Sequence, residues 1–122
     1  MRNEGVNALV DVLKDHGYSV KRNATLTGYS GIKHKFDVIA EKGEITLFFN
    51  FTNDVRVKFE YLSMIGKYMD LKNSGTKFFL MVSAKDEQRL EELCSEVGLI
   101  TYADLNELVD KVQRTLEEIE LS

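Results

Sequence analysis

The stretch GYSGIKHKFDVIAEKGEITLFFNF, residues 28–51, decides the fold of this chain. It opens with a glycine-containing turn. Apolar and polar residues then alternate over about 33–41, as they do in a strand that is buried on one face. A Lys-Gly turn leads into a further strand-like segment at 44–52. The two segments predict paired antiparallel strands, and Asp37 is the carboxylate in the middle of the first strand.

Hydrophobic periodicity predicts the remaining elements. Before the two strands above, the pattern predicts a helix that ends before Gly17 and a strand over 18–26. After them it predicts a helix from Asn53 or Asp54 to 73–75, a strand at 77–83 and a helix from Ser83 to Gly98. A short strand at 99–101 and a helix from Asp104 complete the chain order. Because helices join the last three strands, those strands should be parallel, whereas the first three should form an antiparallel meander. The predicted fold class is therefore α/β, a mixed sheet flanked by helices in the order αβββαβαβα, in one domain over 1–122.

The alternation also assigns side chains to the two faces of the strand at 33–41. Phe36, Val38 and Ala40 should share one face, and Lys35, Asp37 and Ile39 should lie on the other.

Charge is distributed unevenly along the chain. The net charge is -4. Residues 1–82 carry 12 Lys and Arg against 9 Asp and Glu, and residues 83–122 carry 4 against 11. Any contact with a polyanion should therefore use the first two thirds. The acidic last third argues against a binder that attaches to every nucleic acid, because Lys and Arg supply most of such affinity.

Other features favour a cytoplasmic protein. The sequence has no apolar run near the length of a membrane span, and Met1 is not followed by a basic and then apolar leader. The single cysteine, Cys94, cannot form an internal disulfide, and its apolar neighbours predict a packing role.

The strand containing Asp37 resembles a known motif. Its residues follow the form Gly-x-Ser-Gly-x-x-His-x-Phe-Asp-Val, here Gly28, Ser30, Gly31, His34, Phe36, Asp37 and Val38. With the order of elements, this resembles the PD-(D/E)xK, or restriction-endonuclease-like, superfamily and its small archaeal and bacterial members. The resemblance implies a restriction-endonuclease-like core in which the aspartate at Asp37 is a metal ligand. It also implies an acidic residue, any residue and a lysine on the next strand.

That next strand departs from the family pattern. Depending on register, the acidic and lysine positions fall on Phe49 and Phe51 or on Phe48 and Asn50. Phenylalanine cannot ligate a hard divalent cation, which prefers oxygen ligands, and an asparagine carbonyl carries no charge. The sequence therefore predicts a degenerate site, no metal cofactor and no nuclease activity.

Two residues of the following predicted helix leave an alternative open. Some members of the superfamily carry a catalytic group there, and Lys58 and Glu60 are the candidates. With Asp37 they would make a nuclease dependent on Mg²⁺ or Mn²⁺. Alternatively, Lys58 and Glu60 are solvated charges opposite the buried stripe of the helix and have no catalytic role. Asp37 would then be a relic of a metal site or a polar strand residue.

The leading functional hypothesis is a nuclease-fold domain that has lost cleavage and binds DNA, RNA or a nucleic-acid-processing partner. A basic rim would make the contact, and its candidate residues are Lys21, Arg22, Lys33, His34, Lys35 and Arg56. The alternative for His34 is a packed strand residue. The second hypothesis is a structural or homodimeric module without nucleic-acid binding, and the third is the metal-dependent nuclease.

Overall fold

A computed structural model describes residues 2–84 and 94–121. The elements are α1 (Arg2–Asp15), β1 (Ser19–Thr27), β2 (Lys33–Lys42), β3 (Ile45–Asn53), α2 (Val57–Leu71), β4 (Thr76–Ser83), β5 (Val97–Tyr102) and α3 (Leu105–Leu121). Most of the helix expected from Ser83 to Gly98 falls on residues 85–93, outside the described part of the chain, and the described residues 94–98 are not helical. None of the described helices is long and apolar enough to cross a membrane.

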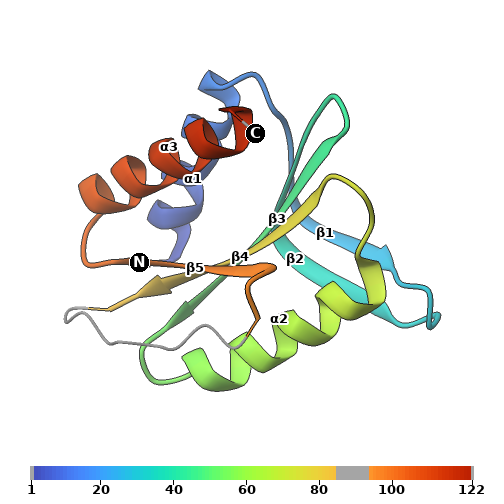
Figure 1. Ribbon diagram of the computed structural model, residues 1–122. Coiled ribbons are helices and arrows are strands. Elements are labelled where there is room, and N and C mark those ends of the chain that lie inside the picture. Colours follow the sequence, from blue (N-terminus) through green and yellow to red (C-terminus); the bar gives the residue numbers. More distant parts are fainter. Residues whose placement is uncertain (1, 85–93, 122) are drawn as a thin grey trace.

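The five strands form one mixed sheet, as the sequence predicts. Their spatial order is β1-β2-β3-β4-β5, with β1, β2 and β3 antiparallel and β3, β4 and β5 parallel. Helices α1 and α3 cover one face of the sheet and α2 covers the other (Figure 1). The α/β layering follows from the chain order, because a helix must cross a face of the sheet to join two parallel strands.

Each face of the sheet has its own hydrophobic core. The core under α1 and α3 includes Leu9, Leu13, Val38, Leu47, Phe49, Phe51, Met81, Leu108, Val112 and Leu116. The core under α2 includes Phe36, Ile39, Phe48, Val57, Tyr61, Met64, Phe78, Leu80 and Val97. In the second core the rings of Phe48 and Phe78 stack with centroids 4.6 Å apart. These two rings fill the middle of the core under α2.

The β1–β2 hairpin twists sharply at its middle, which overturns one expectation. Phe36 does not share a face with Val38 and Ala40, because it packs under α2 while they pack under α1 and α3. The change of face coincides with Asn23, whose φ is +49°, opposite Asp37. A left-handed residue in a strand breaks the regular alternation, so residues of equal parity on either side of it face opposite cores.

Two expected helix boundaries are also different. Gly98 does not end a helix; it lies within β5 beside Phe79, and a Cβ there would stand 2.9 Å from that ring. Asn53 does not cap α2, because its Oδ1 accepts hydrogen bonds from the N–H groups of Val55 and Arg56 in the turn before the helix. The expected cap of α3 is confirmed, since Asp104 Oδ1 accepts from the N–H of Glu107 at 2.8 Å.

Candidate functional site

Asp37 lies where β2 and β3 separate. The β2–β3 ladder ends at the pair Val38 and Phe49, so the next opposed residues are Asp37 and Asn50. There the side chains replace the backbone ladder. Asn50 Oδ1 accepts from the N–H of Asp37 at 2.8 Å, and Asp37 Oδ2 accepts from the N–H of Phe51 at 2.8 Å. The carboxylate of Asp37 therefore holds the two diverging strands together.

The structure assigns the two β3 residues that face α1. Phe49 and Phe51 pack in the core under α1 and α3, at 1% and 6% exposure, whereas Phe48 packs under α2 and Asn50 Nδ2 approaches the sulfur of Met64. The ring of Phe51 fills the space beside α1, because a Cβ at Gly5 would stand 3.1 Å from it. Of the two registers that the sequence left open, the one with Phe49 and Phe51 therefore faces α1 and supplies no polar group.

Lys67 on α2 is a residue that the sequence analysis missed. Its Nζ donates to the carbonyl of Lys35 at 2.7 Å and lies 5.1 Å from the centroid of the Phe36 ring. Burial lowers the pKa of Lys67, and the nearby carboxylates of Glu60 and Asp37 oppose that lowering. Glu60 and Lys67 are two helical turns apart and therefore share a face of α2, which is the sequence signal that could have found the pair.

The two predicted α2 candidates, Lys58 and Glu60, lie in the first turn of α2. Lys58 is exposed and makes no hydrogen bond or ion pair within the described residues. Glu60 pairs with Arg56 at 3.5 Å. The ammonium of Lys67 lies close enough to Asp37 for this carboxylate to oppose the lowering of the Lys67 pKa.

The metal expected from the resemblance does not fit these residues. Across the described ranges 2–84 and 94–121, no group of three or more His, Cys, Asp and Glu side chains could hold a metal ion. Asp37 is the carboxylate of the site, one of its oxygens accepts from a backbone N–H, and Phe49 and Phe51 offer no ligand. Hard divalent cations need several oxygen ligands, so we derive no metal-dependent step from this arrangement.

Three of the predicted residues do come together. Arg22, Lys35 and Asp37 line a pocket of about 350 Å³ with Asn3 and Val6 of α1. This pocket, which we call the Asp37 pocket, lies between the start of α1 and the twisted hairpin.

The other basic candidates lie outside its lining. Lys21 and Lys33 are exposed on β1 and β2, and Lys33 is on the same face as Lys35 because the two are two residues apart in a strand. Arg22 is partly tied down, since its guanidinium donates to Asn7 Oδ1 at 2.7 Å. Arg56 lies at the start of α2 and pairs with Glu60.

His34 points away from the Asp37 pocket and takes part in a separate cluster. Its Nε2 lies 2.6 Å from Asp70 Oδ2, which also accepts from the Ser30 hydroxyl at 2.6 Å. The other oxygen of Asp70 accepts from the N–H of Ser30 at 2.8 Å. These hydrogen bonds, that of the Ser30 side chain foremost and His34 next, lower the pKa of Asp70 to about 2. We call this cluster the Asp70 clasp.

The Asp70 clasp explains much of the glycine-containing motif. Gly28 must be a glycine, because a Cβ there would stand 1.9 Å from a carboxylate oxygen of Asp70. Gly31 has a φ of +87°, which glycine adopts readily. The motif residues Gly28, Ser30 and His34 therefore fasten the β1–β2 turn to α2. Because both Ser30 and His34 bind the carboxylate, the arrangement holds no nucleophile activated by a base.

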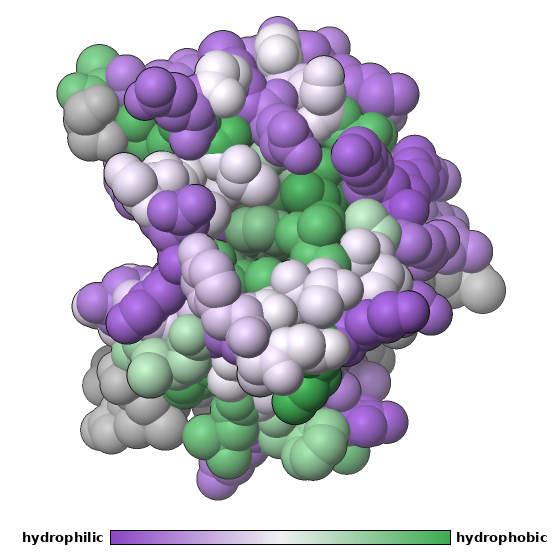
Figure 2. Space-filling model, turned by 90° about the vertical axis from the view of Figure 1, so that its right-hand side faces the viewer, coloured by the Kyte–Doolittle hydropathy of each residue, from purple (hydrophilic) through white to green (hydrophobic). Residues whose placement is uncertain are grey.

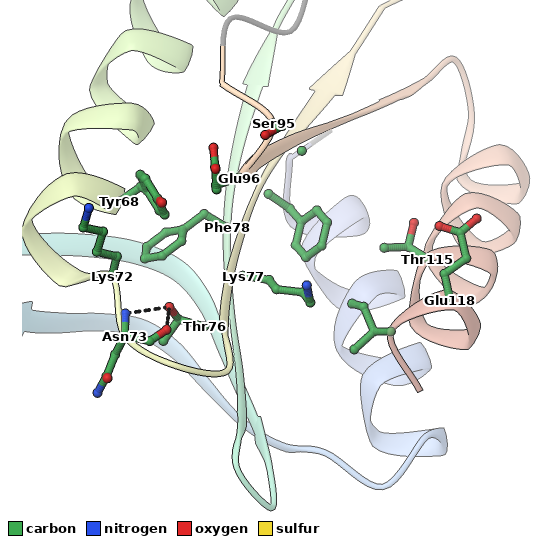
Figure 3. A pocket seen from close by; sticks show the side chains of 13 residues that line it. Tyr68, Lys72, Asn73, Thr76, Lys77, Phe78, Ser95, Glu96, Thr115 and Glu118 are labelled. Atoms are coloured by element: carbon green, nitrogen blue, oxygen red, sulfur yellow. Dashed lines mark hydrogen bonds between the residues drawn. The ribbon is translucent and has the colours of Figure 1, made fainter. Parts of the chain in front are cut away.

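A second hollow lies at the other end of the sheet. It measures about 500 Å³ and lies at the start of β4 and β5, between the ends of α2 and α3 (Figure 3). Its lining mixes charges of both signs, with Lys72 and Glu96 toward α2 and Lys77 and Glu118 toward α3 (Figure 3). None of the site residues predicted from the sequence lines it. Three of them, Arg22, Lys35 and Asp37, line the Asp37 pocket instead.

Comparisons with known proteins extend the description of the fold. Neither a protein-family model nor a curated protein matches the chain. A crystal structure of AF1548, a protein of unknown function, matches with a TM-score of 0.63 and 15% identity. A chain from an assembly of Thermococcus gammatolerans McrB AAA+ hexamers with bound McrC matches with a TM-score of 0.54 and 13% identity.

The shared region is only part of each of those proteins. The matches cover 88% and 92% of this chain, but 65% of the AF1548 chain and 30% of the chain from the McrB and McrC assembly. At such low identity the similarity is one of fold alone.

Proposed function

We propose that this chain is a restriction-endonuclease-like domain that has lost the metal site and binds nucleic acid through the rim of the Asp37 pocket. The observation that carries the proposal is that the residues at the expected metal site have structural roles. The carboxylate of Asp37 binds the N–H of Phe51. The superfamily pattern asks for an acid and a lysine either at Phe49 and Phe51, which are buried core residues, or at Phe48 and Asn50, and neither pair supplies them. Arg22 and Lys35 line the pocket, and among the described residues no group of three or more His, Cys, Asp and Glu side chains could hold a metal ion.

Basic residues around this pocket supply the proposed contact. Arg22 and Lys35 line it, and the exposed Lys33, two residues before Lys35 on β2, extends the positive charge on the same face. Lys21 pairs with Ile39 of the core under α2 and therefore lies on the other face of the sheet. Phosphate groups bind such side chains mainly through charge, with release of counterions, so binding by this surface depends on salt. His34 and Arg56 have partners elsewhere and are not assigned a role in it.

Fluorescence anisotropy tests the proposal with labelled single-stranded, duplex and branched DNA and RNA in EDTA. We expect binding at low salt that weakens steeply as salt rises. The double variant Lys33→Ala with Lys35→Ala should bind more weakly and lower the salt slope by about 2, because each phosphate contact contributes about one unit. Salt-independent binding, or an unchanged slope in this variant, would contradict the proposal.

A matched variant controls for the change in net charge. Lys14→Ala with Lys77→Ala also removes two exposed lysines, one near the end of α1 and one near the start of β4, and neither lines the Asp37 pocket. We expect this control to bind nearly as well as the unaltered protein. Equal losses in the two double variants would show that only net charge matters.

The second candidate function is a structural or assembly module. The match to a chain from an assembly of AAA+ hexamers with a bound partner favours a protein-binding role. The two proposals separate in the anisotropy assay: absence of binding to every DNA and RNA leaves the assembly role as the remaining one. A metal-dependent nuclease, the third candidate, predicts Mn²⁺-dependent cleavage that disappears in Asp37→Ala.

A further inference from the structure

Helix α2 is apolar on two opposite sides. Its inner side buries Val57, Tyr61 and Met64 against the sheet. Its outer side carries a second row that we call the outer stripe: Val55 in the preceding turn, then Phe59, Leu62, Gly66 and Met69, with the four large side chains 60% to 86% exposed. A helix that is apolar on both sides is normally covered on both sides.

The outer stripe has the spacing of a seam between two helices. Its residues are separated by four, three, four and three positions, which is the alternation of a and d positions in paired helices. In contrast, α3 buries its apolar row of Leu108, Val112 and Leu116 and presents no comparable exposed row. Figure 2 shows apolar side chains gathered along its lower edge, which is the α2 side of the molecule in Figure 1.

The β1–β2 turn continues this apolar surface. Tyr29 and Ile32 are 79% and 60% exposed. The N–H of Tyr29 donates to the carbonyl of Asp70 at 3.1 Å, so the turn is fixed beside the residue that follows Met69. The Asp70 clasp therefore holds two further large side chains at the end of the outer stripe.

We propose that the outer stripe and the β1–β2 turn form the interface of a homodimer in which two copies of α2 pack antiparallel. A two-fold axis at the middle of the stripe places Leu62 over Gly66 of the second copy and Phe59 over Met69. The large side chain of Leu62 therefore meets a glycine, which has no side chain. The same axis brings Val55 next to the turn that carries Tyr29 and Ile32. The surface is thus self-complementary, as an isologous interface requires.

The size of the surface suits a second copy of the chain. Its six large apolar side chains expose on the order of 600 Å², and polar neighbours would bring the contact near the roughly 800 Å² per partner of a stable interface. An apolar center of this size with a polar rim is typical of such contacts. Antiparallel packing also sets the dipoles of the two helices against each other, which is favourable.

Sedimentation velocity tests the interface with one variant and one matched control. The monomer mass is 14.0 kDa, so a dimer has twice that mass, about 28 kDa. We expect the unaltered chain to sediment as the dimer at about 100 µM and Leu62→Glu to sediment as the monomer. Leu121→Glu makes the same change at an 87% exposed helical position outside the stripe and should remain dimeric. A monomeric unaltered chain, or a dimer that survives Leu62→Glu, would overturn the proposal.

Disulfide trapping tests the antiparallel arrangement without relying on a destabilising charge. In a Cys94→Ser background, Phe59→Cys and Met69→Cys proteins should form a disulfide dimer when mixed, and neither should do so alone. The two positions are ten residues apart, about 15 Å along the helix, so like positions cannot meet in the antiparallel pair. Cross-linking of each variant to itself would instead indicate parallel helices and overturn this arrangement. Nucleic-acid binding is read separately, so failure here leaves the proposed function untouched.

Discussion

Replacing Asp37 by alanine distinguishes a strand clamp from an idle relic of a metal site. The substitution removes the acceptor of the Phe51 N–H, a hydrogen bond of 2.8 Å to an ionised group in a partly buried place. Hydrogen bonds to charged groups contribute about 1.5–3 kcal/mol, and the orphaned N–H keeps its desolvation cost. We therefore expect the free energy of unfolding to fall by about 1.5–3 kcal/mol and Tm by roughly 5–15 °C.

Urea and thermal denaturation measure this loss, with two further variants for comparison. Asp37→Asn keeps an oxygen acceptor without its charge, so it should cost about half as much as Asp37→Ala. Asp11→Ala removes an exposed aspartate of α1 and should change stability by less than about 0.5 kcal/mol. If the Asp37 carboxylate does not stabilise the contact between β2 and β3, Asp37→Ala will change the free energy of unfolding as little as Asp11→Ala, or will increase it. That result would refute the clamp.

Three further predictions follow from single contacts. Because hydrogen bonding lowers the pKa of Asp70 to about 2, from an unfolded value near 4, its stabilising contribution is complete above about pH 4 and is lost as the pH falls through 2. Thermal melts between pH 2 and 6 should show this loss, and Asp70→Asn should flatten that part of the profile; an unchanged profile in the variant would exclude the clasp. Gly75→Ala should lower Tm sharply, since φ is +82° and the new Cβ would stand 2.3 Å from the Glu44 carbonyl oxygen; an unchanged Tm would contradict this geometry. Phe51→Ala should cost about 3–5 kcal/mol in urea denaturation because the ring is buried against α1, and a loss below 1 kcal/mol would place Phe51 outside the core.

The order of elements was readable from the sequence because it depends on local periodicity. The antiparallel meander, the parallel strands and the cap at Asp104 all follow from patterns within a few residues. The absence of an acid and a lysine from β3 was equally visible, and the structure adds that Phe49 and Phe51 are the pair on the α1 side.

The contacts that the sequence did not reveal join residues far apart in the chain. Asp70 is 36 residues from His34 and 40 from Ser30, and Lys67 is 32 from Lys35. Hydrophobic periodicity says which face a residue takes but not which distant side chain meets it. The change of face at Asn23 was missed for a related reason, because a single left-handed residue alters the alternation without any signal in composition.

The helical periodicity that predicts α2 does not indicate that the outer side of this helix is also apolar. The buried row of Val57, Tyr61 and Met64 is sufficient to explain the helical period. Apolar residues on the opposite side are therefore read as ordinary exposed residues. Only the exposure of Phe59 and Leu62 in the folded chain shows that a second apolar face exists.

Binding and cleavage measured together in one reaction test the central claim most directly. The same labelled DNA and RNA are incubated with the protein in EDTA and in Mn²⁺, read by anisotropy and then separated on a denaturing gel. Our account predicts an equal, salt-sensitive rise of anisotropy in both conditions and uncut strands throughout. Mn²⁺-dependent cleavage that is lost in Asp37→Ala, or no binding to any of these nucleic acids, would contradict it.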